Sequence, residues 1–177
     1  RNVFAKAESR VANVPGADTT LLFALTSKCK QAGASFDQTA GDFISHAKDL
    51  LYYDTSKNKN YERIELWLND EIRHGSVFSV LRSQEMLMVE SADKLVKAVQ
   101  DLVAYLEGID EAAEVQREMA SLALEVKELR QAAETIFEAE PKSFAYQASL
   151  NRKKDKLEDS FEALPLDIGA KLNETLY

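Results

Sequence analysis

The stretch EVQREMASLALEVKELRQAAETIF, residues Glu114 to Phe137, decides the fold class. It contains neither glycine nor proline, and its apolar residues return at the spacing of one helix face. That face consists of two rows with a seven-residue step: Val115, Leu122, Leu129 and Ile136, and beside them Met119, Val126 and Ala133. Such a repeat predicts a helix that packs at a small angle against neighbouring helices.

The same seven-residue step runs through two longer segments that precede this stretch. Their main rows are Leu22, Cys29, Phe36, Phe43 and Leu50, and Trp67, His74, Leu81, Met88, Leu95 and Leu102. A row of small residues in the first segment predicts the close approach of another helix; its members are Thr26, Gly33, Ala40 and Ala47. Because no segment shows strand alternation between turn residues, the sequence predicts an all-α fold, an elongated antiparallel bundle of three to four helices with coiled-coil packing.

Scarce glycine and proline residues, together with polar runs, mark the expected ends of these helices. We expect one domain over residues 1–177. Its helices are expected at about 2–12, 18–53, 60–106, 110–139, 143–164 and 166–176. The heptad phase slips at Gly108, which a chain-reversing turn explains; a stutter inside one very long helix is the alternative. The first short helix is expected to extend the second past Pro15, and the segment 144–164 to form a partial fourth helix.

The composition limits the partners and the compartment. A net charge of −8 predicts no nucleic-acid partner and no direct binding to acidic lipid, because like charges repel. The single cysteine, Cys29, lies in an apolar row and is expected to be buried. No apolar run has membrane-spanning length, and no initiating methionine or signal peptide is present, which suits a processed or trimmed ectodomain. Asn173 begins a glycosylation acceptor pattern, Asn173-Glu174-Thr175.

Four polar residues occupy or adjoin the apolar rows: His46, His74, Glu71 and Asp42. If the first hairpin turns near residue 57, these side chains form one polar layer. The layer could fix helix register, or lie open to solvent where the bundle splays, or hold a metal ion. Glu71 and His74 have the Glu-x-x-His spacing of carboxylate-bridged di-metal bundles, but a second such pair is missing from the sequence. We therefore predict no metal and no cofactor.

Sequence motifs for catalysis are lacking. The chain has no glycine-rich phosphate loop, no Gly-x-Ser-x-Gly and no His-Glu-x-x-His, and its two histidines leave few ways to build a nucleophile–base pair. The sequence therefore predicts a protein that is not an enzyme.

Aromatic residues gather around the polar run 54–60. They are Tyr52, Tyr53, Tyr61 and Trp67. One interpretation is a hydrophobic plug that closes the bundle end. The other is a partner-binding tip, since Trp and Tyr are favoured as interface anchors.

Two families show similarity in architecture and composition. The heptad rows and the runs DEAAE (110–114) and QAAE (131–134) resemble GPI-anchored glutamate/alanine-rich helical surface proteins of trypanosomes. This resemblance implies a surface-coat or receptor-like role and a C-terminal membrane anchor. The stretch DKLEDSFEALPLDIGAKLNETLY, residues 155–177, looks like the start of the third helix of BAR domains, and implies a membrane-binding scaffold dimer.

These observations lead to one main expectation. The chain is expected to be a non-enzymatic cell-surface or extracellular bundle that acts in display, in a coat or in binding of a protein partner, with self-association as one form of that binding. A BAR-like scaffold is the alternative, with a cytoplasmic location. A metal-dependent bundle enzyme centred on Glu71 and His74 is the third hypothesis.

Overall fold

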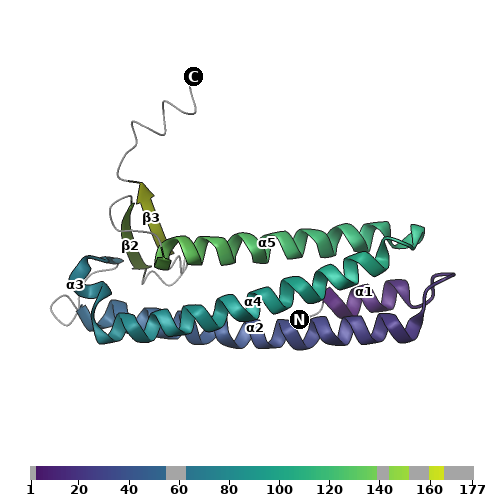
Figure 1. Cartoon of the computed structure of the whole chain (residues 1–177), viewed down its shortest axis with the longest axis horizontal. Coiled ribbons are helices and arrows are strands. Elements are labelled where there is room, and N and C mark those ends of the chain that lie inside the picture. Colours follow the sequence, from purple (N-terminus) through teal and green to yellow (C-terminus); the bar gives the residue numbers. More distant parts are fainter. Residues whose placement is uncertain (1–2, 55–62, 139–143, 152–159, 166–177) are drawn as a thin grey trace, which may run out of the picture. The chain divides into compact units, whose positions relative to one another are not determined.

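The computed structural model describes residues 3–54, 63–138, 144–151 and 160–165 (Figure 1), and the side-chain surroundings of 3–51 and 66–137. The contacts divide the chain into two compact units. Unit 1 comprises Arg1–Gly41 and Met86–Ala132, and unit 2 comprises Asp42–Glu85 and Ala133–Tyr177. Three long helices contribute residues to both units: α2 (Thr19–Asp54), α4 (Ser76–Leu106) and α5 (Ala113–Glu138).

The predicted bundle of long antiparallel helices is confirmed. In unit 1, Lys28 Nζ of α2 lies 2.6 Å from Asp101 Oδ2 of α4, and Thr39 Oγ1 lies 2.6 Å from Ser91 Oγ. The residue numbers rise on α2 while they fall on α4, so the two helices are antiparallel. Between α4 and α5 the chain turns through a short 3₁₀ helix, η2 (Asp110–Ala112), which confirms the turn predicted at Gly108.

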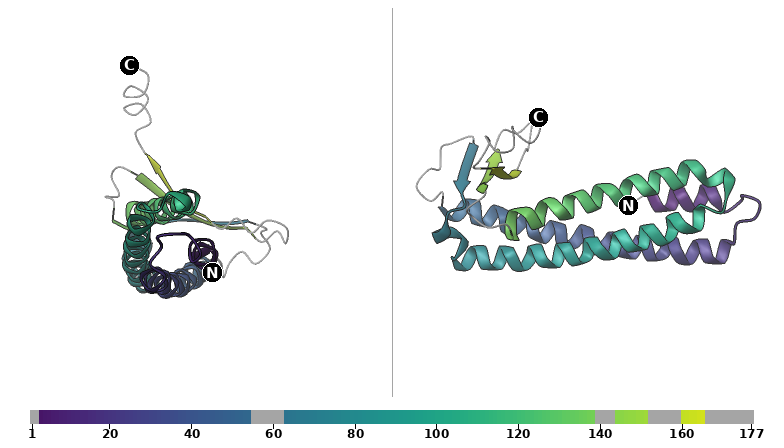
Figure 2. Two further views of the ribbon diagram at one scale, coloured as in Figure 1. Left: turned by 90° about the vertical axis from the view of Figure 1, so that its right-hand side faces the viewer. Right: turned by 45° about the horizontal axis from the view of Figure 1, so that its top comes forward.

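The first short helix, α1 (Val3–Val11), is present as predicted, but it does not extend α2. Glu8 of α1 accepts hydrogen bonds from Thr26 and Lys30, so α1 folds back alongside α2 (Figure 2). The connection contains Gly16 at φ +86°, a left-handed conformation that side chains disfavour. Asp18 then caps α2, because its Oδ1 accepts the backbone N–H of Leu21 at 3.1 Å.

The heptad rows form the core of unit 1. The predicted row residues that are buried in unit 1 are Leu22, Cys29, Met88, Leu95, Leu102, Val115, Met119 and Val126. Ala92, Val99 and Leu106 of α4 are buried in the same core. Leu129 is an exception, since 48% of it is exposed. Burial of such side chains is the main source of stability in a bundle.

Unit 2 contains a sheet that the sequence did not predict. Strand β1 (Arg63–Trp67) pairs antiparallel with β2 (Phe144–Asn151), and β2 pairs antiparallel with β3 (Ser160–Pro165). The register sets Ile64 opposite Leu150 and Ala148 opposite Phe161.

Two predicted helices are therefore wrong in part or whole. The helix expected over 60–106 is replaced at its start by β1 and the short helix α3 (Asp70–Arg73), and α4 begins at Ser76. The helix expected over 143–164 is replaced by β2 and β3, so the partial fourth helix is absent from 144–151 and 160–165. The helix start that the BAR resemblance implies is likewise a strand at Ser160–Pro165. A short apolar run is compatible with the spacing of a helix face and with that of a strand face. The strand pairing that decides between the two joins residues far apart in the sequence. The helix expected at 166–176 lies outside the described residues.

The core of unit 2 centres on Phe137, which is 2% exposed. Its ring stacks on Phe78 at a centroid distance of 5.5 Å and meets Phe43 edge-on at 5.7 Å. The Arg73 guanidinium lies 5.4 Å from the centre of the Phe78 ring and donates to the carbonyl oxygens of Ile136 and Phe137. These carbonyls lie in the last turn of α5, where the helix dipole favours a cation.

Candidate functional site

The four residues of the predicted polar layer do not come together as one site. His46 donates from Nδ1 to the carbonyl oxygen of Asp42, 2.8 Å away in the same helix. His74 donates in the same way to the carbonyl oxygen of Asp70 at 2.6 Å. Glu71, His74 and the side chain of Asp42 are exposed. Each imidazole is thus held by its own helix rather than by a layer across the bundle.

The register of α2 against α4 explains why this layer does not form. In unit 1, Lys28 pairs with Asp101 and Thr39 with Ser91. The midpoint of this pairing falls within β1, whereas the sequence-based prediction placed it at residue 57. The added length comes from β1 and α3, which lie between α2 and α4. Thr39 of α2 therefore lies opposite Ser91 of α4.

The Glu-x-x-His pair gains no further ligands from the part of the chain that the structure describes. Among those residues, no three His, Cys, Asp or Glu side chains come together in a group that could hold a metal ion. Glu71 instead lines a pocket of about 400 Å³ in unit 2. The other lining residues are Leu50, Leu66, Asn69, Ile72, Gly75, Ser76, Val77 and Phe78.

Trp67 is the member of the predicted aromatic cluster whose surroundings the structure describes. Leu66 and Leu68 on either side of it are each 5% exposed, whereas Trp67 is 53% exposed. This is the alternation of an extended segment with one face in the core and the other in solvent. The plug interpretation is therefore wrong for Trp67. The side chains of Tyr52 and Tyr53, as well as Tyr61 and Asn173, lie outside the described residues.

Cys29 is buried in unit 1, as predicted. Its thiol donates to the carbonyl oxygen of Ala98 at 3.3 Å. Burial raises the pKa of the Cys29 thiol to about 11, because a thiolate would be poorly solvated there. The raised pKa therefore favours the protonated thiol at neutral pH, which disfavours reaction of Cys29 as a thiolate.

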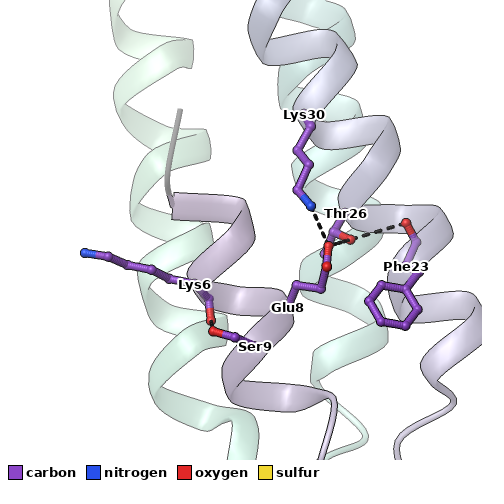
Figure 3. A network of polar contacts seen from close by, with 6 residues as sticks. All are labelled: Lys6, Glu8, Ser9, Phe23, Thr26 and Lys30. Carbon is purple, nitrogen blue, oxygen red and sulfur yellow. Dashed lines mark hydrogen bonds and ion pairs between the residues drawn. The ribbon is translucent and has the colours of Figure 1, made fainter.

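Sequence reasoning missed a polar contact that joins α1 to α2 (Figure 3). Thr26 is fully buried, and its hydroxyl donates to Glu8 Oε2 at 2.8 Å. Lys30 Nζ lies 2.5 Å from the same oxygen. The hydrogen bond from Lys30, and secondly that from Thr26, lowers the pKa of Glu8. The signal in the sequence was the small-residue row, because Phe4 of α1 packs against Gly33 of that row.

A second pocket lies in unit 1, at the Val3–Phe4 end of α1. It has a volume of about 610 Å³. Its apolar walls come from α1, α2, α4 and α5, and the charged residues Lys30 and Asp37 also line it. This pocket was not predicted from the sequence, because α1 was expected to extend α2 rather than to lie beside it.

No helix among the described residues is both long and apolar enough to cross a membrane. Comparison of the chain with family models, with curated proteins and with solved structures finds no match.

Proposed function

We propose that this chain is a non-enzymatic binding protein and that Trp67 of unit 2 anchors a protein partner. The observation that carries the proposal is the half-exposed indole. Trp is highly buried on average in folded proteins, and it is among the residues that contribute most to protein interfaces. Its neighbours Leu66 and Leu68 are buried, so the backbone of this segment is held in place and the indole is presented in a defined direction.

The proposed location is a cell surface or the extracellular space. It rests on the resemblance of the heptad rows and of the runs 110–114 and 131–134 to helical surface proteins. The outer faces of α5 mix acidic and basic side chains that suit water better than a lipid surface, which argues only against direct binding of the helix to lipid. Exposed residues of this kind are Glu114, Arg117, Glu118, Glu125, Lys127 and Glu128. Labelling of intact cells with a membrane-impermeant biotin ester tests the location. Recovery of the chain only after the cells are lysed would contradict it.

The anchor role is tested by differential capture with matched variants. Immobilised wild-type chain, Trp67→Ser and Leu124→Ser are incubated with solubilised surface proteins and with a differently tagged copy of the chain. Leu124 is the matched control because it is 56% exposed and lies on α5 in unit 1. We expect a protein that wild type and Leu124→Ser retain and that Trp67→Ser loses by at least about tenfold. Identical retention by all three would refute the role of Trp67.

A further inference from the structure

The sulfur-containing side chains of the protein differ sharply in their access to water. The sequence has one cysteine and three methionines, and all of them lie in unit 1, within the part of the chain that the structure describes. Cys29 and Met119 are each 0% exposed and Met88 is 4% exposed, whereas Met86 is 62% exposed. An oxidant in solution therefore meets one sulfur atom of the folded chain directly, that of Met86.

The packing of α4, and not the local sequence, separates Met86 from Met88. The two residues are neighbours in the run Glu85-Met86-Leu87-Met88-Val89, so their chemical surroundings along the chain are nearly the same. A step of two residues turns the helix by about 200°, which places them on opposite sides of α4. Met88 consequently lies in the core and Met86 in solvent.

The thiol of Cys29 does not compete with Met86 for an oxidant. A thiolate is normally the more reactive sulfur, but burial raises the pKa of the Cys29 thiol to about 11, so little thiolate is present at neutral pH. The thiol is also held inside unit 1, where it donates to the carbonyl oxygen of Ala98 at 3.3 Å. A methionine thioether does not titrate, so its reactivity follows its exposure.

From these contrasts we propose that Met86 is a reversible oxidation site, at which a peroxide converts the thioether into methionine sulfoxide. The sulfur attacks one oxygen of hydrogen peroxide, so that an S–O bond forms and the O–O bond breaks. The sulfur loses two electrons, and the second oxygen leaves as hydroxide, which takes up the proton of the transferred hydroxyl and becomes water. A thiol-dependent sulfoxide reductase reverses the change: two thiols supply two electrons and two protons, become a disulfide and release the oxygen as water.

Oxidation at this position changes the surface of α4 and spares the core. The adjacent Leu87 is 49% exposed, so Met86 is part of an apolar portion of the surface, and a sulfoxide makes that portion polar. At Met88 or Met119 the same oxygen would be buried without a hydrogen-bond partner, which is costly. The site goes beyond the proposed partner binding and does not depend on Trp67, which belongs to unit 2.

The probe is hydrogen peroxide, added to the whole folded chain in a time course. Tryptic digestion and fragment-ion mass spectrometry then locate each added oxygen. We expect one oxygen at Met86, added at least about tenfold faster than at Met88 or Met119, since a buried sulfur reacts only when the structure opens. In concentrated urea the three methionines should react at similar rates, which shows that the fold sets the selectivity. Equal rates at all three in the folded chain would overturn the proposal.

Matched variants and a reductase test the assignment and its reversibility. Met86→Leu and Met88→Leu both keep volume and helix propensity, and only Met86→Leu should abolish the fast uptake of oxygen. Oxidised wild type should keep the slow thiol labelling of Cys29, and the two epimer-specific sulfoxide reductases with a dithiol should restore the original mass. The proposal is overturned if Met86→Leu takes up oxygen as fast as wild type, if oxidation at Met86 exposes Cys29, or if the reductases leave the oxygen in place.

Discussion

Units 1 and 2 draw on the same three long helices but complete their cores differently. Unit 1 adds α1, whose contacts with α2 lie close along the chain, as between Glu8 and Thr26. Unit 2 adds a sheet in which β1 pairs with β2, and both α4 and α5 lie between these strands in the sequence. Pairing of segments that are far apart in the sequence costs more chain entropy, and this cost arises before the stabilising contacts have formed. We therefore expect unit 2 to be the less stable and the slower to form.

Each unit carries its own intrinsic probe, so the comparison can be measured directly. Cys29 is the single cysteine, and it is buried in unit 1. Trp67 is the single tryptophan, and it lies in unit 2. Thiol labelling thus follows the opening of unit 1, because a buried thiol with a raised pKa reacts slowly until the unit opens. Indole fluorescence follows unit 2.

The largest effect is expected from Phe137→Ala. This side chain is 2% exposed and contacts the rings of Phe78 and Phe43, so its removal should lower the free energy of unfolding by about 3–5 kcal/mol. Urea titration should show the Trp67 transition shifted to lower urea more than the Cys29 labelling transition. Leu102→Ala, in the core of unit 1, should lower the free energy of unfolding by about 2–5 kcal/mol. In this variant the Cys29 labelling transition should shift more than the Trp67 transition. Equal shifts of both probes in both variants would show that the two units unfold as one.

A smaller effect is expected from Arg73→Ala. The guanidinium donates to the carbonyl oxygens of Ile136 and Phe137 at 3.4 and 3.3 Å and lies over the Phe78 ring. These bonds are long, so we expect a loss of about 1–2 kcal/mol, confined to the Trp67 probe. Hydrogen exchange should rise in the last turn of α5. Arg73→Lys keeps the positive charge but loses the planar guanidinium with its several N–H donors. Its free energy of unfolding should lie between those of wild type and Arg73→Ala. Unchanged exchange at 133–137 would show that Arg73 does not cap this helix.

The same contrast explains which features the sequence could predict. Heptad rows repeat the same local signal of helix packing at every second turn. The long helices and buried residues such as Cys29 and Leu102 were therefore predicted correctly. The strands of unit 2 depend on partners far along the chain, and nothing local in residues 144–151 specifies β1 as the partner. The missed strand and α3 displaced the register, which is why His46, Glu71 and His74 were wrongly grouped. Trp67 was predicted as a partner-binding candidate from its residue type, and that prediction did not depend on the register of the helices.

The smallest effect is expected from Glu8→Gln, within unit 1. The folded pKa of Glu8 is lowered below its ordinary value of 4.5, so the carboxylate stabilises the fold above that value, and this contribution is lost as the pH falls through the folded pKa. Glutamine still accepts hydrogen bonds from Thr26 and Lys30, so the variant removes only the charge, worth less than about 1 kcal/mol. The melting temperature of wild type should exceed that of Glu8→Gln at pH 7, and the difference should vanish at pH 2. A difference that persists in acid would assign the effect to packing of α1 rather than to charge. Because α1 belongs to unit 1, we expect the Trp67 fluorescence to be unchanged by this substitution at either pH, and a response of Trp67 would show that the two units are coupled.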